Sequence, residues 1–361
     1  MLGEEFEIDI ERVAHGGHCV GRVETPEGRR VVFVRHALPG ERVRAAVTAV
    51  EKSFLRADAI EILQASPDRV EAPCPLAHPD GCGGCDFQHV ALPAQRGLKE
   101  AVIVEQFARL AGMDVAVSVE EVPPTLRWRT RMHYVSLPGG HRGLRKHHSH
   151  AIIEVDDCLI AAPDAREPDR QVVTETVLGH TFQVAGDGFW QVHHEAPRIL
   201  VETVLELLKP APGERALDLY AGVGLFTSFL AEAVGPTGQV TSVEGDRTAS
   251  RLAGQNLARF AHVTTTCAPV ERAVSGPADL VVLDPPRVGA KRRVVEAIAA
   301  LQPRAVAYVA CDPAALARDV AYFAEAGYAM TELRAFDLFP MTHHVECVAL
   351  LEPVAGRARE L

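Results

Sequence analysis

A cysteine and a glutamate near the C-terminal end of the chain are the residues whose types could do covalent chemistry. Cys311 ends the apolar run AVAYVA and is followed by Asp-Pro, and Glu346 lies inside the run VECVALL. Because an unpaired charged carboxylate is costly to bury, Glu346 should face a cleft and have a raised pKa. Together the two suggest a nucleophile and a base that transfers a proton. Each has a simpler explanation alone, since an isolated cysteine is usually inert and a strand glutamate usually points to solvent.

A glycine-rich turn in DLYAGVGLF predicts a site for a nucleoside. Gly222 and Gly224 allow a ligand to approach the backbone, and Glu244 at the end of the next expected strand can hold two ribose hydroxyls. Thr227 stands where a third glycine would support a dinucleotide pyrophosphate, which disfavours a nicotinamide-dependent oxidoreductase. A nucleoside cofactor without pyrophosphate fits better. S-adenosylmethionine is such a cofactor, with Asp218 available near its charged amino-acid portion.

The segment LDPPR ends another expected strand with an acid, Asp284, and two prolines. The prolines remove backbone donors and fix φ, so this edge of the sheet should be stiff. A stiff loop there can hold a planar base against a methyl donor. The alternative is a simple turn that ends the strand.

Four cysteines are spaced like the ligands of a metal site. Two form a C-x-x-C pair with glycines between them, a third lies shortly before the pair, and a fourth follows far downstream. Four thiolates can complete an iron–sulfur or a zinc site, and His78 or His89 could replace the distant cysteine in a zinc site. Unligated buried thiols are the remaining alternative. The four are Cys74, Cys82, Cys85 and Cys158.

The elements that must position these residues divide the chain into parts. From about residue 165 expected strands and helices alternate, and several strands carry a polar residue at or near the C-terminal end. This pattern predicts a doubly wound α/β domain with ligands beyond the carboxyl ends of its strands. Residues 1–62 instead read as short strands with Gly and Pro breaks, which predicts a small antiparallel barrel.

Charge limits the partners of the protein. The formal net charge of -11 argues against a nucleic-acid binder that coats the phosphate backbone with cations. Residues 125–150, however, are rich in Arg, Lys and His, include a Trp and a Tyr, and contain no Asp or Glu. Cations interleaved with aromatic rings suit single-stranded nucleic acid. A solvated β-hairpin with a PGG turn explains the segment equally well.

Cysteine use and hydropathy indicate the compartment. The eight cysteines are too sparse for a disulfide scaffold, and three of them cluster, which favours a reduced compartment. No run of about 18 or more uncharged apolar residues is present, and the N-terminus is acidic, so we expect neither a membrane span nor a cleaved signal. The sequence predicts a cytoplasmic protein.

In combination, these motifs resemble the RNA uracil-5-methyltransferase family, specifically its iron–sulfur-containing members with a TRAM domain, a small RNA-binding barrel. HGGHCVGRV and VFVRHALPGERV are similar to a TRAM domain. The resemblance covers nearly the whole chain. It rests on GFWQV, DLYAGVG, Glu244, LDPPR, ACDP and FPMTHHVE, in that order, with the cysteine cluster upstream.

The resemblance implies a role for each matching residue. Cys311 would be the nucleophile and Glu346 the base that removes the C5 proton. The four clustered cysteines would bind a 4Fe-4S cluster. Ala310 and Ala221 replace a Ser and a Cys common in the family, and neither change removes a reacting group. The S-adenosylmethionine site would use Gln191, Tyr220, Glu244 and Asp284, together with Gly222 of the glycine-rich turn.

The expected architecture follows in three domains: a TRAM-like, OB-like β-barrel over 1–62, a central α+β iron–sulfur domain with the basic hairpin over 63–165, and a Rossmann-like methyltransferase domain over 166–361. Cys158 would complete the cluster from the central domain. We expect a monomer.

The expected reaction is methylation of uridine C5 in RNA. The Cys311 thiolate would add to C6, and a target base must leave any stack it occupies to reach the site. 23S ribosomal RNA is the expected substrate and transfer RNA the first alternative. A metal-stapled RNA-binding or assembly factor without turnover is the second. A cytosine-5 RNA methyltransferase is disfavoured, because such enzymes often have Pro-Cys where this chain has Asp284, Pro285 and Pro286.

Overall fold

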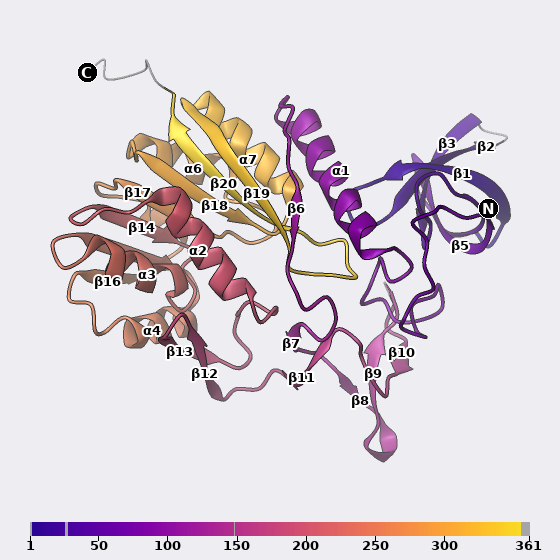
Figure 1. The fold of residues 1–361 in the computed structure, drawn as a ribbon, viewed down its shortest axis with the longest axis horizontal. Coiled ribbons are helices and arrows are strands. Elements are labelled where there is room, and N and C mark those ends of the chain that lie inside the picture. Colours follow the sequence, from indigo (N-terminus) through magenta and orange to yellow (C-terminus); the bar gives the residue numbers. More distant parts are fainter. Residues whose placement is uncertain (1, 26–27, 148, 355–361) are drawn as a thin grey trace.

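The computed structural model describes residues 2–25, 28–147 and 149–354. Figure 1 shows an N-terminal barrel, a central region of short strands, and a large sheet flanked by helices that contains the C-terminal half of the chain. Within the described ranges, none of the helices combines the length and the apolar character needed to cross a membrane.

The N-terminal strands form a closed five-stranded barrel, which confirms the predicted small barrel. The pairs are antiparallel except for the third and fifth strands, which run parallel. Alternate side chains of the strands point into the barrel and are buried. Ile8 and Ile10, for example, are each 3% exposed. Closure leaves no free sheet edge. The strands, in the order in which they pair, are β1 (Glu5–Val13), β2 (Cys19–Thr25), β3 (Gly28–Arg35), β5 (Phe54–Gln64) and β4 (Arg42–Val50).

The central region begins with a cysteine-containing loop and continues into one long helix and several short strands. Two of the strands pair in parallel, β7 with β11, and three form a small sheet in the order β10, β9, β8. The elements are α1 (Leu92–Leu110), β6 (Val119–Glu121), β7 (Arg129–Arg131), β8 (Val135–Ser136), the 3₁₀ turn η1 (Pro138–Gly140), β9 (Arg142–Arg145), β10 (Ile152–Glu154) and β11 (Ala161–Arg166).

The C-terminal half is built on an eight-stranded sheet in the order β16, β15, β14, β17, β18, β20, β19, β6. All neighbours are parallel except β20, which is antiparallel to both β18 and β19. A separate antiparallel hairpin, β12 with β13, precedes the sheet. The strands are β12 (Val172–Val177), β13 (His180–Ala185), β14 (Arg215–Leu219), β15 (Gln239–Glu244), β16 (Val263–Cys267), β17 (Leu280–Leu283), β18 (Ala305–Ala310), β19 (Tyr328–Asp337) and β20 (Glu346–Pro353).

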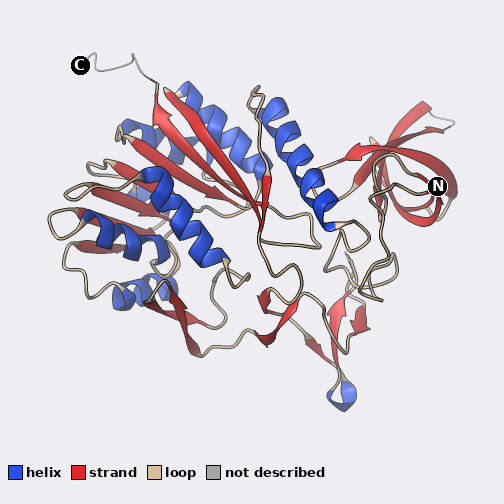
Figure 2. Ribbon diagram, in the orientation of Figure 1, coloured by secondary structure: helices blue, strands red, loops and turns tan. Residues whose placement is uncertain are grey.

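Helices cover both faces of this sheet (Figure 2), as a doubly wound fold requires. One buried cluster includes Leu200 and Leu230 from α2 and α3, and the other includes Ile298 and Phe323 from α6 and α7. The predicted α/β architecture is therefore confirmed. The helices are α2 (Ala196–Leu208), α3 (Leu225–Val234), α4 (Arg247–Asn256), α5 (Val270–Ala273), α6 (Lys291–Ala300) and α7 (Pro313–Glu325).

The central region is not packed separately from the large sheet. Strand β6 pairs with β19, and Ile103 and Phe107 of α1 and Val119 of β6 are buried in the same cluster as α6 and α7. Helix α1 thus lies between the barrel and the sheet (Figure 1). The core of the large sheet therefore extends into residues predicted to form a central domain.

The strand order reverses at β14, which has β15 on one side and β17 on the other. The carboxyl ends of β14, β15, β17 and β18 meet at one edge of the sheet, and β20, being antiparallel, begins at that edge. In open α/β sheets, ligands bind in the crevice at such a reversal point.

Candidate active site

Strand pairing brings Cys311 and Glu346 together. The β18–β20 ladder ends with Ala310 paired to Cys347, and extending its register by one residue beyond β18 places Cys311 opposite Glu346. Directly opposed residues of antiparallel strands project from the same face, with Cβ atoms about 5 Å apart. Glu346 is 2% exposed, whereas Cys311 is half-buried. The thiol and the carboxyl are thus neighbours at the edge where ligands bind.

Burial and neighbouring charges shift the pKa of both groups upward. Burial, and then the negative charges of Glu346 and Asp284, raise the pKa of the Cys311 thiol to about 12. Burial, and then Asp284, raise the pKa of Glu346 well above its ordinary value. Arg287 acts in the opposite direction on both. The predicted rise in the pKa of Glu346 is present, and its buried carboxylate is a stronger proton acceptor than an exposed one.

Asp284 and Asp218 are two further buried carboxyls at this edge. Burial, followed by the charge of Asp218, raises the pKa of Asp284 to about 7. Burial is also the main cause that raises the pKa of Asp218 to about 7, partly offset by hydrogen bonds from Thr227. Asp284 directly follows β17, and its N–H donates to Leu219 O of β14 at 3.3 Å. The two carboxyls therefore flank the point where the strand order reverses.

The glycine-rich turn is shaped for a ligand. Tyr220 has a φ of 61°, unusual for a non-glycine residue, and Gly222 and Gly224 also have positive φ. The N–H of Gly222 donates to Glu244 Oε2 at 2.8 Å, which fixes this carboxylate at the end of β15. Asp218 Oδ1 is buried and has no hydrogen-bond partner among the described residues. An orphaned carboxylate oxygen suits a cationic group, so the turn fits a nucleoside with a positively charged tail.

Gln191 lines a cavity to which no residue of this turn contributes. It is 8% exposed and contributes with Trp190 to a cavity of about 460 Å³. Arg131 and Arg166 line the same cavity. The structure thus gathers Cys311, Glu346, Asp284, Tyr220, Gly222 and Glu244 at one sheet edge and places Gln191 on the wall of this second cavity.

The four predicted metal-binding cysteines line one cavity of about 290 Å³. The N–H of Gly84 donates to Cys82 Sγ at 3.4 Å, and Gln88 Nε2 donates to Cys85 Sγ at 3.4 Å. A Cβ on Gly83 would lie 2.5 Å from the backbone of His147, so glycine is required for this close packing. Over the described part of the chain, no three His, Cys, Asp or Glu side chains form a group that could hold a metal ion.

The basic segment forms the β8–β10 sheet and the strands around it. Arg142 lies over the ring of Tyr134 with 4.3 Å between guanidinium carbon and ring centroid, and Arg127 forms an ion pair with Asp157. Arg145, Lys146 and neighbouring residues line an open cavity of about 550 Å³. The predicted hairpin is present. His148 of this segment lies outside the described residues.

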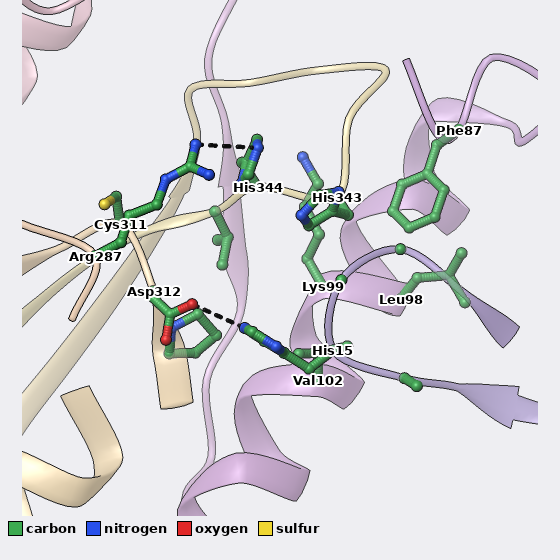
Figure 3. A pocket seen from close by; sticks show the side chains of 15 residues that line it. His15, Phe87, Leu98, Lys99, Val102, Arg287, Cys311, Asp312, His343 and His344 are labelled. Atoms are coloured by element: carbon green, nitrogen blue, oxygen red, sulfur yellow. Dashed lines mark hydrogen bonds and ion pairs between the residues drawn. The ribbon is translucent and has the colours of Figure 1, made fainter. Parts of the chain in front are cut away.

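Several contacts near Cys311 were not anticipated from the sequence. The residues around Cys311 line a cavity of about 130 Å³. Figure 3 shows Cys311, Arg287 and Asp312 on one side of it and His15, Lys99, His343 and His344 around the rest. His15 of the barrel bonds Asp312, Arg287 bonds His344, and His343 bonds Asp86. The members of two of these pairs are 297 and 257 residues apart in sequence, and no spacing pattern signals such contacts.

Two sequence profiles match the ends of the chain. The TRAM domain profile matches residues 1–60, and the tRNA (Uracil-5-)-methyltransferase profile matches residues 275–354. Between them, a profile of protein-L-isoaspartate(D-aspartate) O-methyltransferase matches residues 190–269, which contain the glycine-rich turn. The matches place the TRAM domain on the barrel and the uracil-5-methyltransferase profile on β17 to β20.

Relatives and solved structures extend the likeness to nearly the full length. An uncharacterized RNA methyltransferase of Streptomyces avermitilis is 44% identical over 436 residues, covering 98% of this chain and 99% of that protein. The 23S rRNA (uracil(1939)-C(5))-methyltransferase RlmD of Alkalilimnicola ehrlichii is 30% identical, with 97% of each chain covered. The crystal structure of the Pyrococcus abyssi tRNA (uracil-54, C5)-methyltransferase with S-adenosyl-L-homocysteine has the same fold, with a TM-score of 0.72, 21% identity, and 95% of this chain and 99% of that chain covered. From these matches and the carboxyl-edge site, the chain belongs to the RNA uracil-5-methyltransferase family, with an N-terminal TRAM domain.

Proposed function

We propose that this enzyme methylates C5 of a uridine in 23S ribosomal RNA, with S-adenosylmethionine as methyl donor. The observation that carries the proposal is the proximity of Cys311, directly after β18, to Glu346, the first residue of β20, beside Asp284. The full-length similarity to RlmD, named for 23S rRNA, supports ribosomal over transfer RNA. The basic, aromatic β8–β10 region and the barrel are the proposed RNA-binding surfaces.

The methyl donor is assigned to the glycine-rich turn. Glu244 would bind the ribose hydroxyls, Gly222 and Tyr220 would bring the backbone close to the nucleoside, and Asp218 would face the cationic amino group. The orphaned Oδ1 of Asp218 supports this assignment. Bound S-adenosylmethionine supplies an electrophilic methyl group on a sulfonium. Asp284 and Gln191 complete the proposed set.

Cys311 activates the base. Uracil C5 is too weak a nucleophile to take a methyl group directly, so the thiolate of Cys311 adds to C6 and the ring becomes an enolate that is nucleophilic at C5. Because the charges of Glu346 and Asp284 raise the pKa of the thiol, neutralising either carboxyl favours the thiolate. Protonation of Glu346 or Asp284 thus lowers the pKa of Cys311 and promotes formation of its thiolate.

Glu346 completes the turnover. After C5 is alkylated, its remaining hydrogen must leave as a proton, which the Glu346 carboxylate accepts. The electron pair of that C–H bond re-forms the C5–C6 double bond and expels the Cys311 thiolate. The placement of Glu346 on the same face as Cys311 keeps the base on the side of the ring that the thiol attacks.

The proposed 4Fe-4S cluster is assigned to the four cysteines. The four cysteines line one cavity, and Gly84 and Gln88 donate hydrogen bonds to two of the sulfurs. Such bonds stabilise thiolate ligands. As they lie in the described part of the chain, the thiols do not form a metal-holding group, so cluster binding would have to draw them together. A zinc site remains the competing assignment for the same thiols.

Anaerobically purified protein is expected to be brown and to contain iron and acid-labile sulfide. Cys85→Ala should lose both, because one of four ligands is removed, whereas Cys267→Ala, which replaces an exposed cysteine at the end of β16, should retain them. Metal and sulfide analysis with absorption spectroscopy measures the outcome. Colourless wild-type protein that contains zinc would contradict the cluster.

Loss of one 5-methyluridine from 23S rRNA is the expected result of deleting the gene. Mass spectrometry of ribosomal and transfer RNA from the deletion strain and its parent would detect the change, and re-expression should restore it. Loss from transfer RNA alone would assign the transfer RNA alternative. Unchanged modification in both, with an unchanged phenotype for Cys311→Ala, would instead favour the non-catalytic RNA-binding factor.

A further inference from the structure

The barrel reaches the residue that follows the proposed nucleophile. His15 lies in the turn between β1 and β2, and its Nε2 is 2.9 Å from Asp312 Oδ2. Figure 3 shows the two side chains meeting across the cavity beside Cys311. The side chains are 41% and 21% exposed. An N-terminal RNA-binding module therefore contacts the backbone segment that carries the reacting sulfur.

Asp312 uses both carboxylate oxygens. Oδ2 bonds His15, while Oδ1 accepts from Ala315 N at 2.8 Å and so caps the first turn of α7. A side chain held at both oxygens has little rotational freedom. Since Asp312 is joined directly to Cys311, its fixed position restricts the backbone from which the thiol projects.

The β1–β2 turn is itself held in place. Gly16 and Gly17 have φ values of 92° and 79°, and a Cβ on Gly17 would lie 2.8 Å from Cβ of His343. Ala14 N donates to His18 O at 2.7 Å across the turn. The turn therefore packs closely against the loop before β20, and this packing fixes the position of His15 beside Asp312.

We propose that the barrel turn positions the nucleophile: His15 holds Asp312, and through Asp312 the backbone of Cys311, in the arrangement that reacts. This rests on the proposed function, because it assigns a positioning role relative to Cys311 as nucleophile. His15 touches neither substrate nor donor in this role. The TRAM domain is then a part of the catalytic assembly as well as an RNA-binding module.

The pair is sensitive to pH in a defined direction. The hydrogen bond that His15 donates to Asp312 raises the pKa of His15 against the effect of burial. The charged pair is therefore complete below the ordinary histidine pKa and weakens as pH rises through the raised value. On Asp312, burial acts upward, but the bonds from His15 and Ala315 outweigh it and lower the pKa. The other charged or titratable groups around His15 are Glu105 with its partner Arg12, Lys99 on α1, His343 and His344 before β20, and Arg287 across the cavity.

His15→Ala is the test, measured as methylation kinetics at saturating RNA. We expect kcat to fall about tenfold, with the KM for RNA and the Kd for S-adenosylmethionine changed by less than about twofold, because geometry and not binding is lost. His15→Gln, which can donate a neutral hydrogen bond, should restore much of kcat. The ratio of wild-type to His15→Ala kcat should shrink as pH rises. This ratio cancels the pH dependence of the thiol itself.

A double-mutant cycle separates the routes by which His15 could act. If His15 acts through Asp312, His15→Ala should cost little when added to Asp312→Asn. As the matched control, Glu325→Gln removes an exposed ion pair with Arg292 from the other end of α7 and should leave kcat unchanged. Thermal unfolding of each variant identifies any loss of fold. If His15→Ala proves unfolded, the comparison of the wild type with His15→Gln replaces it as the test.

Three outcomes would overturn the inference. An unchanged kcat would show that the pair is a surface contact without effect on the reaction. A higher KM for RNA with unchanged kcat would make His15 an RNA contact, and additive effects in the cycle would remove the route through Asp312. If the wild-type enzyme itself proves inactive, the proposed function fails separately. Hydrogen exchange at the first amides of α7 then still reports whether His15 holds Asp312, with faster exchange expected in His15→Ala.

Discussion

Replacing Cys311 with alanine is expected to lower the rate of uridine methylation by about 10⁴-fold or more, because the proposed nucleophile that adds to C6 is removed. Binding of S-adenosylmethionine should be retained, since the proposed donor site does not include Cys311: apart from Asp284 and Gln191, it lies on β14, β15 and the turn between β14 and α3. Transfer of labelled methyl groups to 23S rRNA fragments measures the rate, and equilibrium binding measures the affinity. The thiol is half-buried and close to the surface cavity, so its truncation leaves the core clusters intact.

Cys347→Ala is the matched control for this substitution. Cys347 lies on the adjacent strand but, being next to Glu346 in sequence, projects from the opposite face into the core. It should keep most of its activity, with some loss of stability from the removed buried sulfur. Wild-type rates in Cys311→Ala, or equal losses in the two variants, would be inconsistent with Cys311 as the nucleophile.

Glu346→Gln is expected to reduce turnover by about 10³-fold and to make a covalent enzyme–RNA complex accumulate. The amide cannot accept the C5 proton, so the reaction stops after the thiol has added and the methyl group has moved. The same change removes a negative charge that raises the pKa of Cys311, so the thiolate should form more readily. Denaturing gel electrophoresis with labelled RNA detects the complex, and alkylation of Cys311 at increasing pH follows the thiol.

Glu352→Gln tests whether the position of the carboxyl matters. Glu352 lies on the same strand, β20, at the end remote from Cys311, where it accepts a hydrogen bond from Thr331. It should turn over normally and accumulate no complex. Combining Glu346→Gln with Cys311→Ala should abolish the complex, and an accumulation that persists in this double variant would mean that another residue forms the bond.

Much of the large sheet could be predicted from the sequence, because its strands are buried on both sides. Parallel strands covered by helices read as nearly continuous apolar runs, so LVVL and AVAYVA stood out, and Asp284 and Cys311 marked their ends. The carboxyl ends of parallel strands must meet at one edge, so the sequence predicted that the residues at those ends lie close together. The chemistry of Cys311 and Glu346 could be suggested from residue type, but their direct opposition needed the antiparallel register of β20.

The remaining features depend on contacts between segments far apart in the chain. Lys99 of α1 is fully buried and donates a hydrogen bond to Asp337 Oδ1 at 2.5 Å. The two residues are 238 positions apart in sequence. In sequence, Lys99 is one more cation on an amphipathic helix, and nothing indicates that this helix packs on the large sheet. The pairs His15–Asp312 and Asp86–His343 are similar. Such pairs follow from how the barrel, α1 and the sheet dock, and local patterns do not encode docking.

Cross-linking to RNA that contains 5-fluorouridine tests the central claim most directly. A base can remove hydrogen from C5 as a proton but cannot remove fluorine as a cation. The reaction therefore stops with the enzyme sulfur bonded to C6 and the methyl group on C5. Digestion and mass spectrometry of the trapped complex identify the bonded peptide. We predict a methylated nucleotide attached to Cys311, and none in Cys311→Ala. A trapped complex bonded to any other residue, or one that persists undiminished in Cys311→Ala, would contradict the account.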